Sequence, residues 1–170
     1  SFVSNASLMT PEKYLELTKA GVDQFSFSLD MPDERHDKNR AIPGLFKHLT
    51  DIVPKMTAMG YYNVAMISVI RKQSLPYLVD IAKKAMEWNA SITFSSYTQL
   101  RTNSNAHSIT SEEDLELLRK QIGELIEMRR DGAPIINSEP VFKNMITFFE
   151  TNSIPNCKTG YRHHVVNPDG

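Results

Sequence analysis

A charged segment, residues 28–40, carries the densest set of side chains that could do chemistry in this 170-residue sequence. The segment reads SLDMPDERHDKNR and ends on Arg40. A partly buried guanidinium can bind a carboxylate through two parallel hydrogen bonds, so Arg40 is a candidate anion-binding residue. The alternative is that the charges of this segment are solvated and pair with one another.

Two neighbouring side chains of the segment, His36 and Asp37, could orient each other or Arg40. We expect them to brace the segment rather than to perform acid–base chemistry. In a further hypothesis, the chain is some other barrel enzyme, which uses loop carboxylates such as Asp30 and Asp37.

Helices and strands are predicted to alternate along nearly the whole chain. Capping residues and apolar periodicity predict helices over residues 10–20, 44–59, 75–88, 110–130 and from Ser138 onward. Thr110 and Glu113 form a capping-box pattern for the fourth of these. Strands are predicted over residues 24–29, 62–69 and 92–97. This order implies parallel strands with right-handed crossovers, hence an α/β sheet or part of a (β/α) barrel.

One face of two predicted strands is small and hydroxylated. Side chains alternate across a strand, so two polar sets each share a face: Ser26, Ser28 and Asp30, and Thr93, Ser95 and Tyr97. Closed barrels fill their interior with branched aliphatic side chains. The pattern therefore predicts an open or partial barrel whose polar face lines a ligand cavity. The alternative is that these hydroxyls bond to nearby backbone groups.

The composition argues against several classes of protein. Lysine and arginine number 19 against 20 acidic residues, a net charge of −1, which gives no electrostatic case for nucleic acid or anionic membrane. No apolar run approaches the roughly 20 residues of a membrane helix. The single cysteine cannot form an internal disulfide. We expect a cytoplasmic protein without nucleic-acid or membrane partners.

Two further candidates lie near the end of the chain. Cys157 is followed by Gly160, and a lone cysteine is most often a small buried apolar residue. His163 and His164 could bind metal, but adjacent side chains on a strand point in opposite directions, so we expect no shared ion.

The segment 28–40 resembles a known family, the radical S-adenosylmethionine (SAM) enzymes. Ser28-Leu29-Asp30, His36-Asp37-x-x-Arg40 and Pro43-Gly44-x-Phe46 look like the segment after the fourth barrel strand in the peptide- and cofactor-maturing branch. Ser4-Asn5-Ala6 is similar to the family's Asn-Gly turn, and Cys157-x-x-Gly160 resembles the start of its auxiliary-cluster extension.

The resemblance implies a fold and a set of site residues. The fold would be a partial TIM-like (β/α) barrel, roughly strands 3 to 6, over residues 1–150, with residues 151–170 starting the extension. Ser28 and Arg40 would hold the amino-acid end of SAM. Asn5 would lie near the same open end of the barrel, and Tyr97 would lie near the adenine of SAM. Cys157 would be a ligand of an auxiliary iron–sulfur cluster.

The sequence also departs from the family's pattern. The C-x3-C-x2-C segment and the Gly-Glu turn after the second strand are missing, and Gln73-Ser74 stands where many relatives have Asn. Ala6 replaces the usual Gly. One cysteine cannot hold a 4Fe–4S cluster through thiolates alone. We therefore expect both ends to be cut, the strand at residues 1–4 to have an exposed edge, and this chain to be inactive alone.

The resemblance implies that the parent enzyme cleaves SAM reductively and abstracts hydrogen from a peptide or cofactor precursor. The electron would come from a reductant protein such as flavodoxin or ferredoxin. The alternative is a non-catalytic α/β module that binds a ligand or partner.

Overall fold

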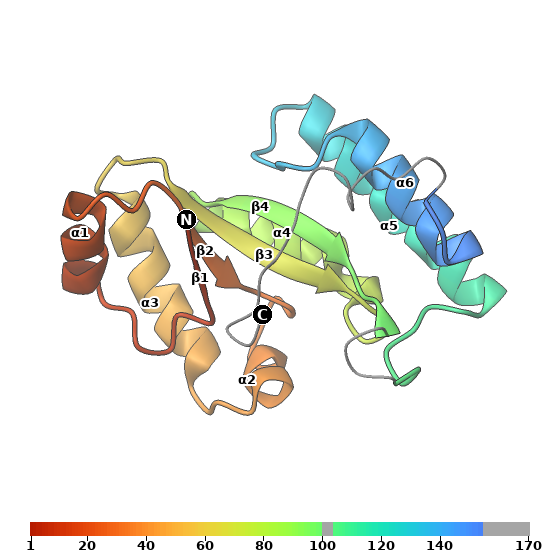
Figure 1. Ribbon diagram of the computed structural model, residues 1–170, viewed down its shortest axis with the longest axis horizontal. Coiled ribbons are helices and arrows are strands. Elements are labelled where there is room, and N and C mark those ends of the chain that lie inside the picture. The colour runs from red at the N-terminus through yellow and green to blue at the C-terminus, as the bar shows by residue number, and fades with distance from the viewer. Residues whose placement is uncertain (100–103, 155–170) are drawn as a thin grey trace, which may run out of the picture.

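Four parallel strands, in the order β1-β2-β3-β4, form the centre of the computed structural model (Figure 1). The structure describes residues 1–99 and 104–154. The strands are β1 Phe2–Ser4, β2 Phe25–Ser28, β3 Val64–Ile70 and β4 Ser91–Ser96. The predicted α/β fold is confirmed, and four parallel strands alternating with helices are consistent with a partial parallel barrel.

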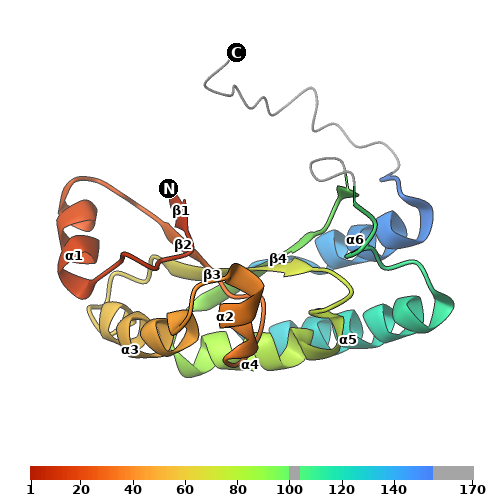
Figure 2. The same ribbon diagram turned by 90° about the horizontal axis from the view of Figure 1, so that it is seen from below.

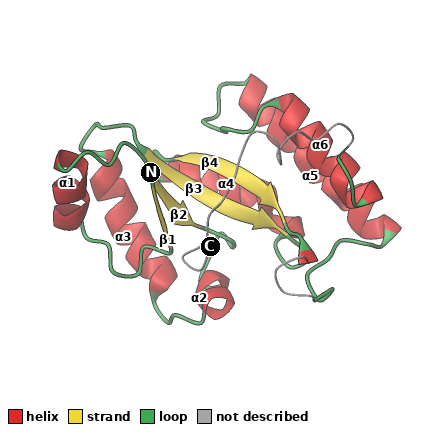
Figure 3. Ribbon diagram, viewed as in Figure 1, coloured by secondary structure: helices red, strands yellow, loops and turns green. Residues whose placement is uncertain are grey.

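The helices connect and flank these strands (Figure 3). Their bounds are α1 Pro11–Lys19, α2 Arg35–Arg40, α3 Leu45–Thr57, α4 Leu78–Glu87, α5 Glu112–Arg130 and α6 Glu139–Thr151. Thr10 caps α1 as expected, and its hydroxyl accepts a hydrogen bond from the Lys13 amide. No described helix is long and apolar enough to cross a membrane.

The sheet is apolar on one face and more polar on the other. Helices α3, α4 and α5 lie along one side of the sheet (Figure 2). The fully buried side chains include Phe25, Phe27, Met66 and Ile92 from the strands. On the opposite face the register aligns Ser28, Ile67 and Thr93 across three strands. These three are only partly buried, and the hydroxyls of Ser28 and Thr93 lie on this face, as predicted for β2 and β4, whereas β3 contributes the apolar Ile67.

Three details differ from the sequence-based expectation. Residues 35–40, which lie outside every predicted helix and strand, form the short helix α2. The hydroxyl that caps α5 belongs to Ser111, which accepts from the Asp114 amide, and not to Thr110. The predicted helix 75–88 begins as a 3₁₀ turn over Leu75–Tyr77 before α4, and 3₁₀ turns are frequent at helix N-termini.

A short segment after α5 covers the outer edge of β4. Ile135 bridges Ile92 in parallel orientation, and Asn137 extends that pairing with its side chain. The Asn137 carboxamide oxygen accepts from the Phe94 amide at 2.6 Å, and its nitrogen donates to the Phe94 carbonyl at 3.0 Å. A buried side chain therefore satisfies backbone groups that an edge strand would leave unpaired.

We predict that Asn137→Ala lowers the free energy of unfolding by about 2–4 kcal/mol, because it leaves a buried N–H and C=O without partners. Chemical denaturation measures the change. Asn144→Ala, an exposed position on α6, is the matched control and should change stability by less than about 0.5 kcal/mol. Equal denaturation midpoints for the two variants would contradict the bridging role.

Candidate functional site

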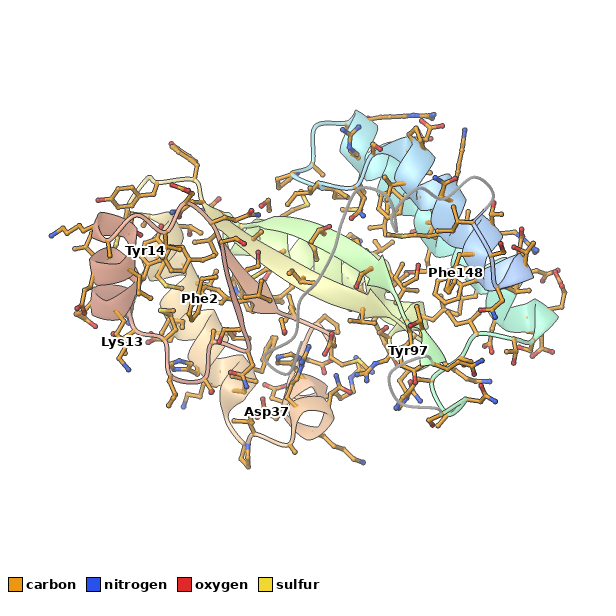
Figure 4. All side chains as sticks on the ribbon, in the orientation of Figure 1. Phe2, Lys13, Tyr14, Asp37, Tyr97 and Phe148 are labelled. Atoms are coloured by element: carbon orange, nitrogen blue, oxygen red, sulfur yellow. The ribbon has the colours of Figure 1, made fainter. Side chains whose placement is uncertain are left out.

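The candidate site is a small cavity at the carboxyl ends of three neighbouring strands. Its volume is about 190 Å³, and the residues that line it are Asp30, Asn39, Arg40, Val69, Arg71 and Tyr97. Asp30 follows β2, Arg71 follows β3 and Tyr97 follows β4. Figure 4 labels Tyr97 beyond β4 and Asp37 on α2, at the same end of the sheet. Ligand sites of parallel α/β folds lie at this end.

Helix α2 brings Asn39 and Arg40 to the cavity, and Asp37 fixes that helix. The Asp37 carboxylate accepts from the backbone amides of Gly44 and Phe46, each at 2.6 Å. Gly44 has φ 78°, a conformation that favours glycine, and it precedes α3. These contacts therefore show that Asp37 braces the segment, as expected. Both of its oxygens are engaged, which leaves little for a catalytic role.

Asp30 is the centre of the polar contacts at the site. Its side chain is 4% exposed, and one carboxylate oxygen lies 2.7 Å from a terminal nitrogen of Arg40. The same oxygen accepts from the Asn39 carboxamide at 2.9 Å. The other oxygen accepts from the Val69 amide at 3.4 Å. These contacts replace the water that a buried carboxylate loses, and they hold α2 against the ends of β2 and β3.

Arg71 joins this network from β3. A terminal nitrogen of its guanidinium donates to the Asn39 carboxamide oxygen, so Asn39 links Arg71 to Asp30. Burial lowers the pKa of the Arg71 guanidinium, and the negative charge of Asp30 opposes that shift. The Nε–H groups of Arg71 and Arg40 are both buried and have no hydrogen-bond partner in the described structure. Two residues that line the cavity therefore each have a buried donor that lacks an acceptor.

His36 lies beneath the site and is fully buried. Its Nδ1 accepts from the Asp30 amide at 3.2 Å, which places the ring proton on Nε2. Burial lowers the pKa of His36 to about 4, opposed by the negative charge of Asp30 and reinforced by the positive charge of Arg40. His36 is therefore neutral at physiological pH and braces the turn after β2, in agreement with its expected role.

The structure brings together some of the sequence-predicted site residues. Arg40 and Tyr97 line the same cavity, and the Tyr97 hydroxyl donates to the Ser104 carbonyl at 3.0 Å. Ser28 is on the same face of β2 as Asp30, two residues earlier, but does not line the cavity. Asn5 lines a different cavity, and its side chain accepts from the Ser7 amide. Cys157 lies outside the described residues.

Asn39 and Arg71 are site residues that the sequence analysis did not single out. The local signal for Arg71 was its place directly after a predicted strand, where ligand-binding residues of such folds are found. No comparable signal marks Asn39, because its role depends on a contact with Arg71 that spans 32 positions.

A larger cavity, of about 730 Å³, lies at the opposite ends of the strands. Its lining includes Asn63 and Val64 at the start of β3 and Ser91 at the start of β4. It carries no charged side chain, whereas the smaller cavity has three. The larger cavity therefore lacks charged side chains, whereas the smaller one has them and lies at the carboxyl ends of the strands. We take the smaller cavity as the candidate site for these two reasons. No group of three or more His, Cys, Asp or Glu side chains among the described residues is arranged to hold a metal ion.

Comparison with known proteins gives partial support for one family. No protein-family model matches the chain. An AdoMet-dependent heme synthase from Oleidesulfovibrio alaskensis is 30% identical over 80 residues, which are 46% of this chain. Those residues are 20% of the synthase, so the match spans about one fifth of that relative's length. The chain thus has distant, partial similarity to a protein whose description names S-adenosylmethionine.

We predict that His36 makes the protein less stable in acid. Its pKa is about 4 when folded and about 6.5 when unfolded, so the unfolded state binds the proton first as pH falls. Stability from neutral His36 is complete above about pH 6.5 and is lost towards about pH 4. Between about pH 7.5 and about pH 5 the loss should be about 2 kcal/mol.

Urea denaturation at the two pH values measures this effect. His36→Asn keeps an acceptor near the Asp30 amide but removes the titrating ring, so its pH dependence should be smaller by that amount. His48→Asn is the matched control and should retain the wild-type slope. An unchanged slope in His36→Asn would show that His36 does not titrate in this way.

Proposed function

We propose that this chain is the later part of the barrel of a radical SAM enzyme and supplies part of its SAM pocket. One observation carries the proposal. Two arginines with buried, unpartnered Nε–H groups line a cavity at the carboxyl ends of three parallel strands. The partial similarity to an AdoMet-dependent protein supports SAM as the ligand.

The chemistry of the cavity suits the methionyl end of SAM. That end carries a carboxylate, and guanidinium groups bind carboxylates through short, charge-assisted hydrogen bonds. Arg40 keeps one terminal nitrogen on Asp30, and the residue lines the cavity. The hydroxyl of Ser28, on the same face of β2, would contribute another hydrogen bond, and Tyr97 would approach the adenine from β4.

The residues of this chain do not fit a catalytic iron–sulfur cluster. A 4Fe–4S cluster needs several thiolates, and the sequence has one cysteine, Cys157. We therefore assign reductive cleavage of SAM and hydrogen abstraction to the parent enzyme, with cluster ligands from another part of it. Between peptide and cofactor-precursor substrates, the heme synthase similarity favours a cofactor precursor.

Arg40→Ala tests the site in a binding experiment. Losing a charged hydrogen-bond donor should weaken SAM binding by about tenfold or more, measured by isothermal titration calorimetry. Arg35→Ala is the control, because Arg35 is exposed and pairs with Asp33. It should bind SAM as the wild type does. Unchanged binding by Arg40→Ala, or no binding by the wild type at millimolar SAM, would contradict the proposal.

Reconstitution with iron and sulfide tests whether this chain can cleave SAM without the rest of the parent enzyme. After treatment with iron and sulfide, the chain alone should form no 5′-deoxyadenosine from SAM under reducing conditions, because it lacks the thiolates for the cluster. Liquid chromatography detects that product. SAM cleavage by this chain would overturn the assignment of the cluster to another part of the parent.

A further inference from the structure

We propose that a second cavity, next to the candidate site, binds one uncharged, ring-shaped apolar group of the parent enzyme's substrate. The cavity lies between the segment after β4, the segment before α5 and the end of α6, and its volume is about 250 Å³. We call it the ring site, after the apolar residues Ile109, Phe148 and Phe149 that line it. The assignment of the ring to the substrate rests on the proposed function.

The ring site and the candidate site are neighbours, because Tyr97 lines both of them. The Tyr97 amide donates to the Ile70 carbonyl at 3.0 Å, and its hydroxyl donates to the Ser104 carbonyl at 3.0 Å. Its ring packs against the edge of the His107 ring, with 5.5 Å between the centroids. Figure 4 labels Tyr97 beyond β4 and Phe148 on α6. A substrate held in the ring site can therefore extend past Tyr97 towards the charged cavity.

Aromatic and aliphatic side chains form the apolar part of the ring site. Ile109 is buried, and Phe148 and Phe149 are partly buried. The centroids of the two phenyl rings are 5.6 Å apart, and their planes meet at 67°. Aromatic rings pack favourably edge to face or with an offset, so a ring that enters the cavity can make such contacts with these two side chains.

The charge of the lining limits the class of ligand. Among the described residues that line the ring site, none carries a charged side chain, whereas the candidate site has three. The polar residues of the lining include Thr98, Ser108 and Thr110, whose hydroxyls are neutral. A charged group that left water for this cavity would find no counterion there. The ring site therefore suits a neutral group.

The volume limits the size of that group. An apolar cavity of about 150 Å³ is large enough to bind benzene. The ring site, at about 250 Å³, therefore has room for one ring or two fused rings. Cavities that hold a whole drug-sized ligand are usually larger, at about 300–1,000 Å³. We infer that the site takes one part of the substrate, either an aromatic side chain of a peptide or one ring of a cofactor precursor.

Methyl NMR tests the ring site without SAM, a cluster or catalysis. The probe is benzamide, which is neutral, and the matched compounds are benzoate, an anion, and benzamidine, a cation. In a chain with carbon-13 in its isoleucine and methionine methyl groups, benzamide should shift the Ile109 resonance saturably at millimolar concentration. Benzoate and benzamidine should bind there about fivefold more weakly or worse, because they lack a counterion. Met86, which lines the larger cavity, is the internal control and should not respond.

Variants of the lining provide the second measurement. Phe149→Ala removes an aromatic contact and should weaken benzamide binding by about threefold or more. Val141→Ala, at an exposed position of the same helix, is the matched control and should bind benzamide as the wild type does. Ser108→Asp adds a counterion, so this variant should bind benzamidine at least as tightly as benzamide. Thermal denaturation establishes that each variant is folded.

The outcomes separate this inference from the proposed function. If benzamide does not shift Ile109, or Phe149→Ala binds it as the wild type does, the inference fails while SAM binding and the proposed function stand. Equal binding of the three compounds would overturn the uncharged class, and displacement of bound SAM by benzamide would overturn a separate site. If benzamide shifts Ile109 but the chain binds no SAM, the ring site stands and the proposed function fails.

Discussion

The buried carboxylate of Asp30 is the constraint on which the site depends. A carboxylate with 4% of its side chain exposed needs several hydrogen-bond or ion-pair partners in place of water, and its partners come from α2 and from β3. These contacts fix the last turn of α2 over the strand ends and orient Arg40. Through Asn39 they also reach Arg71. The Asp37 bonds to the start of α3 hold the same helix from its other side. The positions of the Arg40 and Arg71 guanidiniums therefore depend on the contacts that the buried Asp30 carboxylate makes.

The asymmetry of the sheet explains why this network faces a cavity. Apolar side chains such as Phe27 and Met66 are buried beneath the helices, while the opposite face carries the partly buried Ser28, Ile67 and Thr93. Parallel strands direct all their carboxyl ends to one edge, so residues that follow three different strands meet there. The larger cavity at the other ends of the strands has volume but no charged side chain. The charged side chains, and not the cavity volume, therefore identify the candidate site.

Much of the fold was predictable from local patterns, and much of the site was not. Alternation of apolar and polar residues in 25–30 and 92–97 predicted both strands and their polar face. Helix α2 was missed because its six residues, RHDKNR, have no apolar periodicity, and its stability comes from Asp37 and His36 contacts with neighbouring elements. The sequence left open whether the charges of 28–40 bind a ligand or pair with one another. The structure shows pairing of Arg40 with Asp30, yet Arg40 also lines the cavity. The ligand-binding roles of Arg40, Ser28, Asn5 and Tyr97 and the cluster-ligand role of Cys157 stay predictions.

A crystal structure of the chain with SAM bound tests the central claim most directly. The account predicts electron density for SAM at the carboxyl ends of β2, β3 and β4, with its methionyl carboxylate within hydrogen-bond distance of the Arg40 guanidinium. The Asp30–Arg40 pair should persist in that complex. SAM bound in the cavity lined by Asn63 and Ser91, or with its carboxylate away from Arg40, would contradict the account.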